Sequence, residues 1–189
     1  MPGSSLWLVP PPTHPLHATI AELIERTLPS TFPDLTGPAF APHMTLTSGI
    51  DPAVYADAGP QAWLDAVPWP RAADVDVRLE RVATQDIFFR RCYLKVAFEK
   101  GDTAYTSPWF LSSCYDEVPP GGSNPIDDQK LDEISKAVEE AGVSLSSSSR
   151  QQEDDASGQR GGWKGGVVWL VPTDRPINEW KPIATRALD

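Results

Sequence analysis

The sequence predicts an α+β fold, in which short antiparallel strands and amphipathic helices occupy separate stretches of the chain. Residues 74–82 alternate apolar and polar side chains, and residues 88–98 continue as a second strand that we expect to pair with the first. Residues 126–141 instead gather apolar side chains on one helical face. The 189 residues include 20 prolines and 13 glycines, an excess that argues against a long helical bundle.

The first third of the chain predicts a strand followed by two helices. Residues 5–10 form an apolar run that ends at prolines, which is typical of a buried strand. A second helix is expected over residues 52–67, with Asp51 as its N-cap and a break at Gly59-Pro60. Before it, a helix that starts at Pro15 and stops at Pro29 and Pro33 carries its apolar residues on one face: Leu16, Ile20, Leu23, Ile24 and Leu28.

Two later stretches predict irregular structure. Residues 101–125 contain no lysine or arginine and are rich in glycine, proline, serine and threonine, so we expect mostly loop. Residues 144–162 are polar and serine-rich, and such a segment buries too little apolar surface to offset its ordering entropy. We therefore expect a disordered loop there. Gly142 is expected to end the helix before it, and structure resumes at residues 163–172.

A short motif occurs twice, as Trp7-Leu-Val-Pro10 and as Trp169-Leu-Val-Pro172. Two unrelated buried strands that end at proline would give the same pattern. If the motif instead reflects duplication, each half of the molecule contributes one such strand and the two halves face each other across a cleft.

Composition excludes several classes of function. The net charge of −10, without a block of lysine or arginine, disfavours binding to duplex nucleic acid, although a single small nucleotide remains compatible. The three histidines include His14 and His17, which we interpret as solvated residues at a helix start rather than as zinc ligands. Two cysteines are too few for a disulfide framework, and no signal or membrane-spanning segment is evident. We expect an intracellular, cytoplasmic monomer that needs no metal or cofactor.

His43-Met44-Thr45 is the most informative local pattern. Strand alternation sends the His43 imidazole and the Thr45 hydroxyl to the same face, two residues apart, where one substrate oxygen meets both. Histidine transfers protons near neutral pH, and a threonine hydroxyl donates a hydrogen bond to a phosphoryl oxygen. The alternative is that His43 simply ends a strand, because such a short pattern has many chance matches.

Several stretches together resemble the fungal 2',3'-cyclic nucleotide 3'-phosphodiesterases of the 2H phosphoesterase superfamily. They are residues 5–10 with the helix that follows, 40–48, 88–95 and 178–181. The resemblance implies two pseudo-symmetric α+β lobes around a central cleft, together forming one bilobal domain over residues 1–189. It also implies metal-independent opening of a nucleoside 2',3'-cyclic phosphate, or of ADP-ribose cyclic phosphate, in RNA metabolism and the processing of tRNA-splicing by-products. Association with the Golgi is a further implication.

By this resemblance, each lobe supplies one His-x-Thr/Ser motif, and the two histidines act as acid and base. His43 and Thr45 match one motif as catalytic residues. Trp7, Tyr93 and Tyr115 resemble aromatic residues that bind the substrate in the cleft. No histidine follows His43, so the second motif is missing, and Trp109 falls near its expected place in a stretch shorter than the family pattern.

Three functional hypotheses follow. The first is a cyclic phosphodiesterase whose hydrolysis is impaired, because loss of a general acid or base costs about 10²–10⁴-fold in rate. The second is a catalytically dead pseudoenzyme that still binds nucleotides. The third is an acidic interaction module whose 144–162 loop engages a partner.

Overall fold

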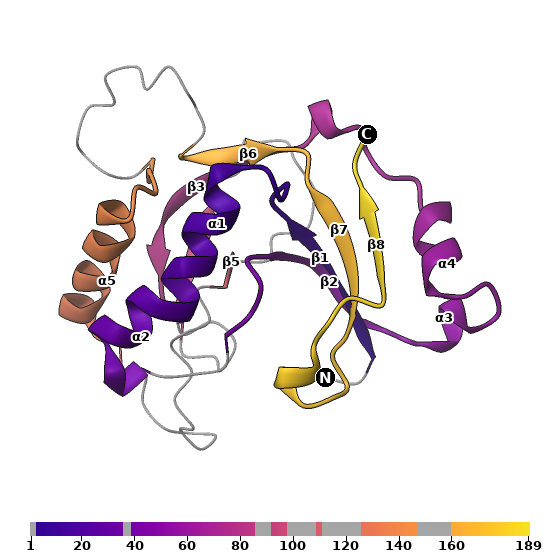
Figure 1. Cartoon of the computed structure of the whole chain (residues 1–189), viewed down its shortest axis with the longest axis horizontal. Coiled ribbons are helices and arrows are strands. Elements are labelled where there is room, and N and C mark those ends of the chain that lie inside the picture. The colour runs from indigo at the N-terminus through magenta and orange to yellow at the C-terminus, as the bar shows by residue number, and fades with distance from the viewer. Residues whose placement is uncertain (1–2, 36–38, 86–91, 98–108, 111–125, 147–159) are drawn as a thin grey trace.

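The computed structural model describes residues 3–35, 39–85, 92–97, 109–110, 126–146 and 160–189. The described strands form one antiparallel sheet in the order β6-β3-β4-β5-β2-β1-β7-β8 (Figure 1). The expected α+β class is confirmed. The strands are β1 (Ser4–Val9), β2 (Met44–Ile50), β3 (Asp76–Ala83), β4 (Tyr93–Val96), β5 (Trp109–Phe110), β6 (Gly162–Lys164), β7 (Val167–Pro172) and β8 (Ala184–Ala187). The α-helices are α1 (Pro15–Glu22), α2 (Leu28–Thr31), α3 (Ala53–Ala56), α4 (Pro60–Ala66) and α5 (Asp128–Glu140).

The strand order divides this sheet into two halves of four strands. One half holds β2, β1, β7 and β8, and the other holds β5, β4, β3 and β6. The halves meet where β2 and β5 pair through Met44 and Trp109. The arrangement agrees with a two-lobed α+β architecture in which the residues that follow His43 lie at the centre of the sheet.

The repeated Trp-Leu-Val-Pro motif does not supply one strand to each half. β1 and β7 are direct antiparallel neighbours in the same half, paired from Ser4 with Pro172 to Val9 with Val167. Trp7 lies opposite Trp169 in this register. Two apolar strands of equal length satisfy each other's backbone groups by pairing side by side, which is not the facing arrangement that duplication would imply.

The first helix continues past the proline that was expected to end it. Pro29 lies in the first turn of α2, and a π-helical turn over Leu23–Thr27 connects α1 to α2. Because proline has no N–H and its ring crowds the carbonyl four residues earlier, the helix widens before Pro29, and the Leu28 N–H bonds to the Leu23 carbonyl. The expected apolar face is confirmed, since all five of its residues are buried.

The other helices begin and end near their predicted caps. Asp51 accepts a hydrogen bond from the Ala53 N–H, and Gly59, with a φ of 82°, separates α3 from α4. Asp127 caps α5 through the Lys130 N–H. Gly142, with a φ of 92°, follows the end of α5 as predicted. In the described ranges, no helix combines the length and the apolar character that crossing a bilayer requires.

The two segments expected to be irregular lie partly outside the described residues. Within 101–125 only Trp109 and Phe110 are described, and they form β5 rather than loop. Within 144–162 both ends belong to the fold, because Leu145 is buried and the Ser144 N–H bonds to the Arg160 carbonyl. Residues 147–159 lie outside the described residues, so the disorder expected for them stays a prediction.

Apolar clusters cover both faces of β1. Leu6 and Leu8 join the main core, to which α1, α2 and α5 also contribute buried side chains. Trp7 and Val9 alternate with them and belong to a smaller cluster with Phe40 and Val171. Trp169, Ile177 and Trp180 pack around this second cluster, which we call the aromatic cluster.

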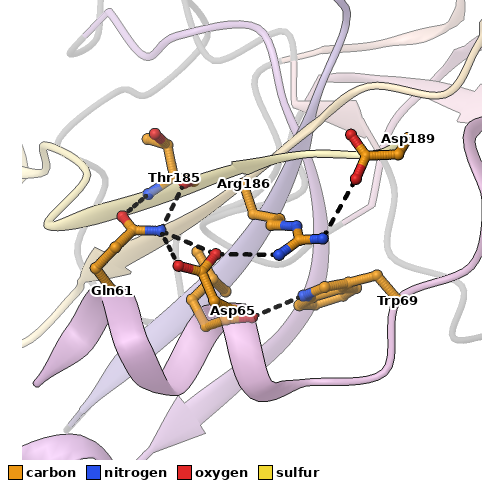
Figure 2. A network of polar contacts seen from close by, with 7 residues as sticks. Gln61, Asp65, Trp69, Thr185, Arg186 and Asp189 are labelled. Carbon is orange, nitrogen blue, oxygen red and sulfur yellow. Dashed lines mark hydrogen bonds and ion pairs between the residues drawn. The ribbon is translucent and has the colours of Figure 1, made fainter. Parts of the chain in front are cut away.

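A polar network joins α4 to the edge strand β8 (Figure 2). The Gln61 side-chain amide donates to the Thr185 carbonyl at 3.0 Å and accepts from the Thr185 N–H at 3.1 Å. One turn later, Asp65 forms an ion pair with Arg186 at 3.3 Å. The side chains of α4 therefore occupy backbone groups along the outer edge of the sheet.

Candidate active site around His43

His43 is held where the chain enters β2, and its side chain is removed from water. The residue is 3% exposed. Its Nδ1 lies 2.7 Å from the carbonyl oxygen of Ala41. A carbonyl oxygen only accepts, so Nδ1 carries the proton, and Nε2 of the neutral ring is the proton-accepting nitrogen. The local backbone thereby fixes the tautomer that a general base at Nε2 requires.

Trp7 stacks directly on the imidazole. The two ring centroids are 3.7 Å apart and the rings are inclined by 13°. Trp7 is itself buried, with one face of its indole against His43. The structure thus places Trp7, which by resemblance was expected to bind the substrate, against the candidate catalytic histidine.

Burial determines the protonation state of His43. Desolvation lowers the pKa of its imidazole from 6.5 to about 4, and the hydrogen bond to Ala41 offsets only part of this effect. The ring is therefore neutral at physiological pH, so that it is available to accept a proton rather than to donate one.

We expect this burial to make the stability of the protein pH-dependent. The unfolded chain, with an ordinary histidine pKa, binds a proton as pH falls below about 6.5, whereas folded His43 does not until about pH 4. The free energy of unfolding therefore falls across this window, by on the order of 3 kcal/mol. Urea denaturation of the wild type and of His43→Phe at pH 7 and pH 4.5 measures the effect, and equal losses of stability in both proteins would contradict it.

Thr45 lies beside Trp7 on the same face of the sheet. The two residues are register partners between β1 and β2, and Thr45 is half-buried. Within the described part of the chain, its hydroxyl has no hydrogen-bond partner. The structure thus brings His43, Thr45 and Trp7 to one face of the sheet, where the Thr45 hydroxyl is unengaged by any of the described residues.

The other residues that the resemblance singled out lie on strands β4 and β5 or outside the described residues. Tyr93 is buried on β4 and alternates with Leu94 of the main core, so it shares the sheet face of His43 and Thr45. Because β5 lies between β4 and β2, Tyr93 is two strand spacings, about 10 Å, from the strand of Thr45. Trp109 pairs with Met44. Tyr115 lies outside the described residues.

His14, read from the sequence as a solvated residue at a helix start, has a structural role as the N-cap of α1. Its Nδ1 accepts a hydrogen bond from the Leu16 N–H at 3.3 Å. Acceptance at Nδ1 ties this ring to the helix end rather than to a ligand. Its pKa is lowered by partial burial.

Two further aromatic residues, which were not predicted as site residues, pack at His43 or at the rings around it. Phe40 meets the imidazole edge-on with ring centroids 6.1 Å apart. Trp180 contacts both Phe40 and Trp7 from the connection between β7 and β8. Both residues lie in stretches that carried the family resemblance. Because Trp180 is 173 positions from Trp7 in the sequence, no local pattern indicated that these rings meet.

Comparison with known proteins assigns the chain to a family. The model of the family described as "Cyclic phosphodiesterase-like protein" matches residues 1–103 and 112–188. The chain belongs to this family. It is 45% identical to a 2',3'-cyclic-nucleotide 3'-phosphodiesterase of Neurospora crassa and 35% identical to one of Phaeosphaeria nodorum, and both comparisons cover all of each chain.

The match to the cyclic phosphodiesterase-like family is interrupted around β5. Residues 104–111 lie outside it. The alignment with the Neurospora protein runs over 225 positions, against 189 residues in this chain. The interruption falls in the stretch where the second histidine motif was expected and not found.

Proposed function

We propose that this protein hydrolyses a nucleoside 2',3'-cyclic phosphate, or the cyclic phosphate of ADP-ribose, without a metal and at a reduced rate. The observation that carries the proposal is the state of His43, which is neutral, protonated on Nδ1 and stacked on Trp7, the register partner of Thr45. The names of the two relatives support the substrate class. Such cyclic phosphates arise in RNA processing, including tRNA splicing, where we place this activity.

In this proposal His43 acts as the general base. Its Nε2 accepts a proton from water as the water oxygen attacks phosphorus, and the bond from phosphorus to the 3' oxygen breaks. The product is the 2'-phosphate, or the 1''-phosphate for ADP-ribose. The Thr45 hydroxyl donates to a non-bridging phosphoryl oxygen, whose negative charge grows in the transition state.

The aromatic residues of this face suit the rest of the substrate. The face extends from the aromatic cluster at β1 toward Tyr93 on β4, over about the length of a nucleotide. We propose that Tyr93 contacts the nucleoside when the phosphate lies at His43. Tyr115 remains a proposed substrate contact from the sequence alone.

The reduced rate follows from proton balance at the leaving group. As the bond to the 3' oxygen breaks, that oxygen needs a proton, and no histidine follows His43 in the sequence. In this proposal no second histidine assists as general acid, and the leaving alkoxide takes its proton from water. This costs about 10²–10⁴-fold in rate.

A turnover assay in the presence of EDTA tests the proposal. The full-length protein is incubated with a 2',3'-cyclic nucleotide, and ³¹P NMR follows the appearance of the 2'-phosphate. Slow conversion to the 2' isomer that persists with EDTA is expected. Formation of the 3'-phosphate, or turnover that EDTA abolishes, would overturn the proposed mechanism.

The missing second histidine supports a second candidate function, a nucleotide-binding pseudoenzyme. In that case, calorimetry detects saturable binding of the cyclic nucleotide or of a 2'-phosphorylated nucleotide, and no product forms. If neither binding nor turnover appears, an interaction module is left. Deletion of residues 147–159, which spares the ends of this segment that belong to the fold, tests that alternative, since it requires partner binding to fall while the fold is retained.

We expect added imidazole to accelerate hydrolysis. Small imidazolium ions donate a proton to the leaving oxygen in place of the absent side chain, so kcat should rise with imidazole concentration at constant pH. The gain should be at least tenfold at saturation, within the roughly 10²–10⁴-fold that general acid catalysis supplies. Choline chloride at matched ionic strength is the control, and an equal response to both cations would contradict a missing general acid.

A further inference from the structure

The imidazole of the candidate base and three further aromatic rings form a closed circuit of contacts. The imidazole of His43 stacks on Trp7 at 3.7 Å. Trp7 meets Trp180 at 6.2 Å, Trp180 meets Phe40 at 5.5 Å, and Phe40 returns to His43 at 6.1 Å. All of these spacings lie within or just below the range in which aromatic rings attract each other. We call this arrangement the ring box.

Trp180 is the member of the ring box that comes from farthest along the chain. Its indole N–H donates to the Arg175 carbonyl at 2.8 Å, and its backbone N–H bonds to the Ile177 carbonyl. The connection between β7 and β8 is anchored at its start, where the Thr173 hydroxyl donates to the Gly3 carbonyl at 3.0 Å. At its end, the Ile183 N–H bonds to the Leu170 carbonyl.

We propose that Trp180 is a positioning residue for His43, closing the ring box and holding Trp7 and Phe40 against the imidazole. This inference deepens the proposed function and rests on His43 acting as the base. Trp180 acts through the two rings that touch His43. Its half-buried side chain forms the outer wall of the box, whereas Trp7 and Phe40 are buried.

Trp180 is a better probe of this role than Trp7. A stacked indole favours the imidazolium by about 0.5–2 kcal/mol, whereas burial of the ring favours the neutral form. Removing Trp7 would change both effects in opposite directions. Removing Trp180 keeps the Trp7 ring in the chain but opens the outer wall of the box to water, so the loss of desolvation is the larger effect and the His43 pKa should rise.

Among the residues that the structure describes, the charged groups near the ring box leave burial as the main variable. Strands β1, β2 and β7 carry no acidic or basic residue, and neither do residues 39–42 or Trp109–Phe110. The charged side chains of the β7–β8 connection that flank Trp180 are all exposed to solvent: Asp174, Arg175, Glu179 and Lys181.

Titration of the His43 ring by NMR tests the proposal without any need for catalysis. The chain has three histidines, so His43→Phe assigns the signal of His43. In Trp180→Ala the pKa of His43 should rise from about 4 by about one unit or more, and Trp180→Phe should shift it less. Trp69→Ala is the matched control, because Trp69 packs on the main core and bonds to the Leu64 carbonyl.

The outcomes distinguish a role of Trp180 in positioning His43 from a role in stabilising the fold alone. If Trp180→Ala is destabilised, Trp180→Leu keeps apolar volume without the ring and is titrated instead. An unshifted His43 pKa in either folded variant overturns the proposal. Where hydrolysis is measurable, kcat should fall about 10- to 100-fold with little change in KM, as expected for a misoriented base. Absence of hydrolysis in the wild type would count against the proposed function, whereas the titration would still decide the role of Trp180.

Discussion

Replacing His43 with alanine is expected to lower the rate of cyclic phosphate hydrolysis by about 10²–10⁴-fold. The substitution removes the nitrogen that accepts the proton from water, while the Ala41 carbonyl and the Thr45 hydroxyl remain. Initial rates of 2'-phosphate formation, measured with EDTA present, give the effect. The loss should appear in kcat, because the base acts in the transition state rather than in binding.

Two control variants test whether the loss of rate comes from the missing nitrogen of His43 rather than from a change in the fold. His43→Phe keeps a ring in the stack on Trp7 but has no titratable nitrogen, so it should fold and be as inactive as the alanine variant. His17→Ala removes a histidine outside the site, and its rates should match the wild type. Residual activity within tenfold of wild type in His43→Phe would exclude His43 as the base.

Replacing Thr45 with valine is expected to cost about 10²–10³-fold in kcat. Valine keeps the β-branched shape that suits β2 but cannot donate to the phosphoryl oxygen. Because the Thr45 hydroxyl has no partner within the described residues, its loss leaves no orphaned acceptor there, and stability should change little. Steady-state kinetics and urea denaturation of the same preparation measure the two quantities.

Thr45→Ser should recover most of this loss, since serine restores the donor. Thr47→Val is a matched control on the same strand, because Thr47 is exposed and pairs with Leu6 rather than with Trp7. If Thr45→Val and Thr47→Val reduce kcat equally, the hydroxyl of Thr45 has no special role in the transition state.

Local patterns in the sequence were sufficient to predict most elements. The helical face that begins at Leu16, the cap at Asp51 and the helix end at Gly142 are all found, because each depends on residues within a few positions of one another. The continuation through Pro29 was missed, because the π-helical turn that accommodates it has no clear sequence signal.

The site was predictable only in part, because only some of its residues are close to one another in the sequence. His43 and Thr45 share a strand face, and alternation alone places them together. The pairing of β1 with β7, and the contact of Trp180 with Trp7, join residues 158 to 173 positions apart. Such contacts depend on which strands become neighbours, and the sequence offered two readings of the repeated motif without a means to choose between them.

The Gln61 amide has a consequence for association between molecules. An outer strand normally presents free N–H and C=O groups to which a strand from another chain can pair. At Thr185 both groups are already bonded to one side chain, which takes the place of a ninth strand. Growth of the sheet by strand addition at β8 would first require α4 to withdraw. At Thr185 the outer edge is therefore closed to other copies of the chain by the side chain of Gln61.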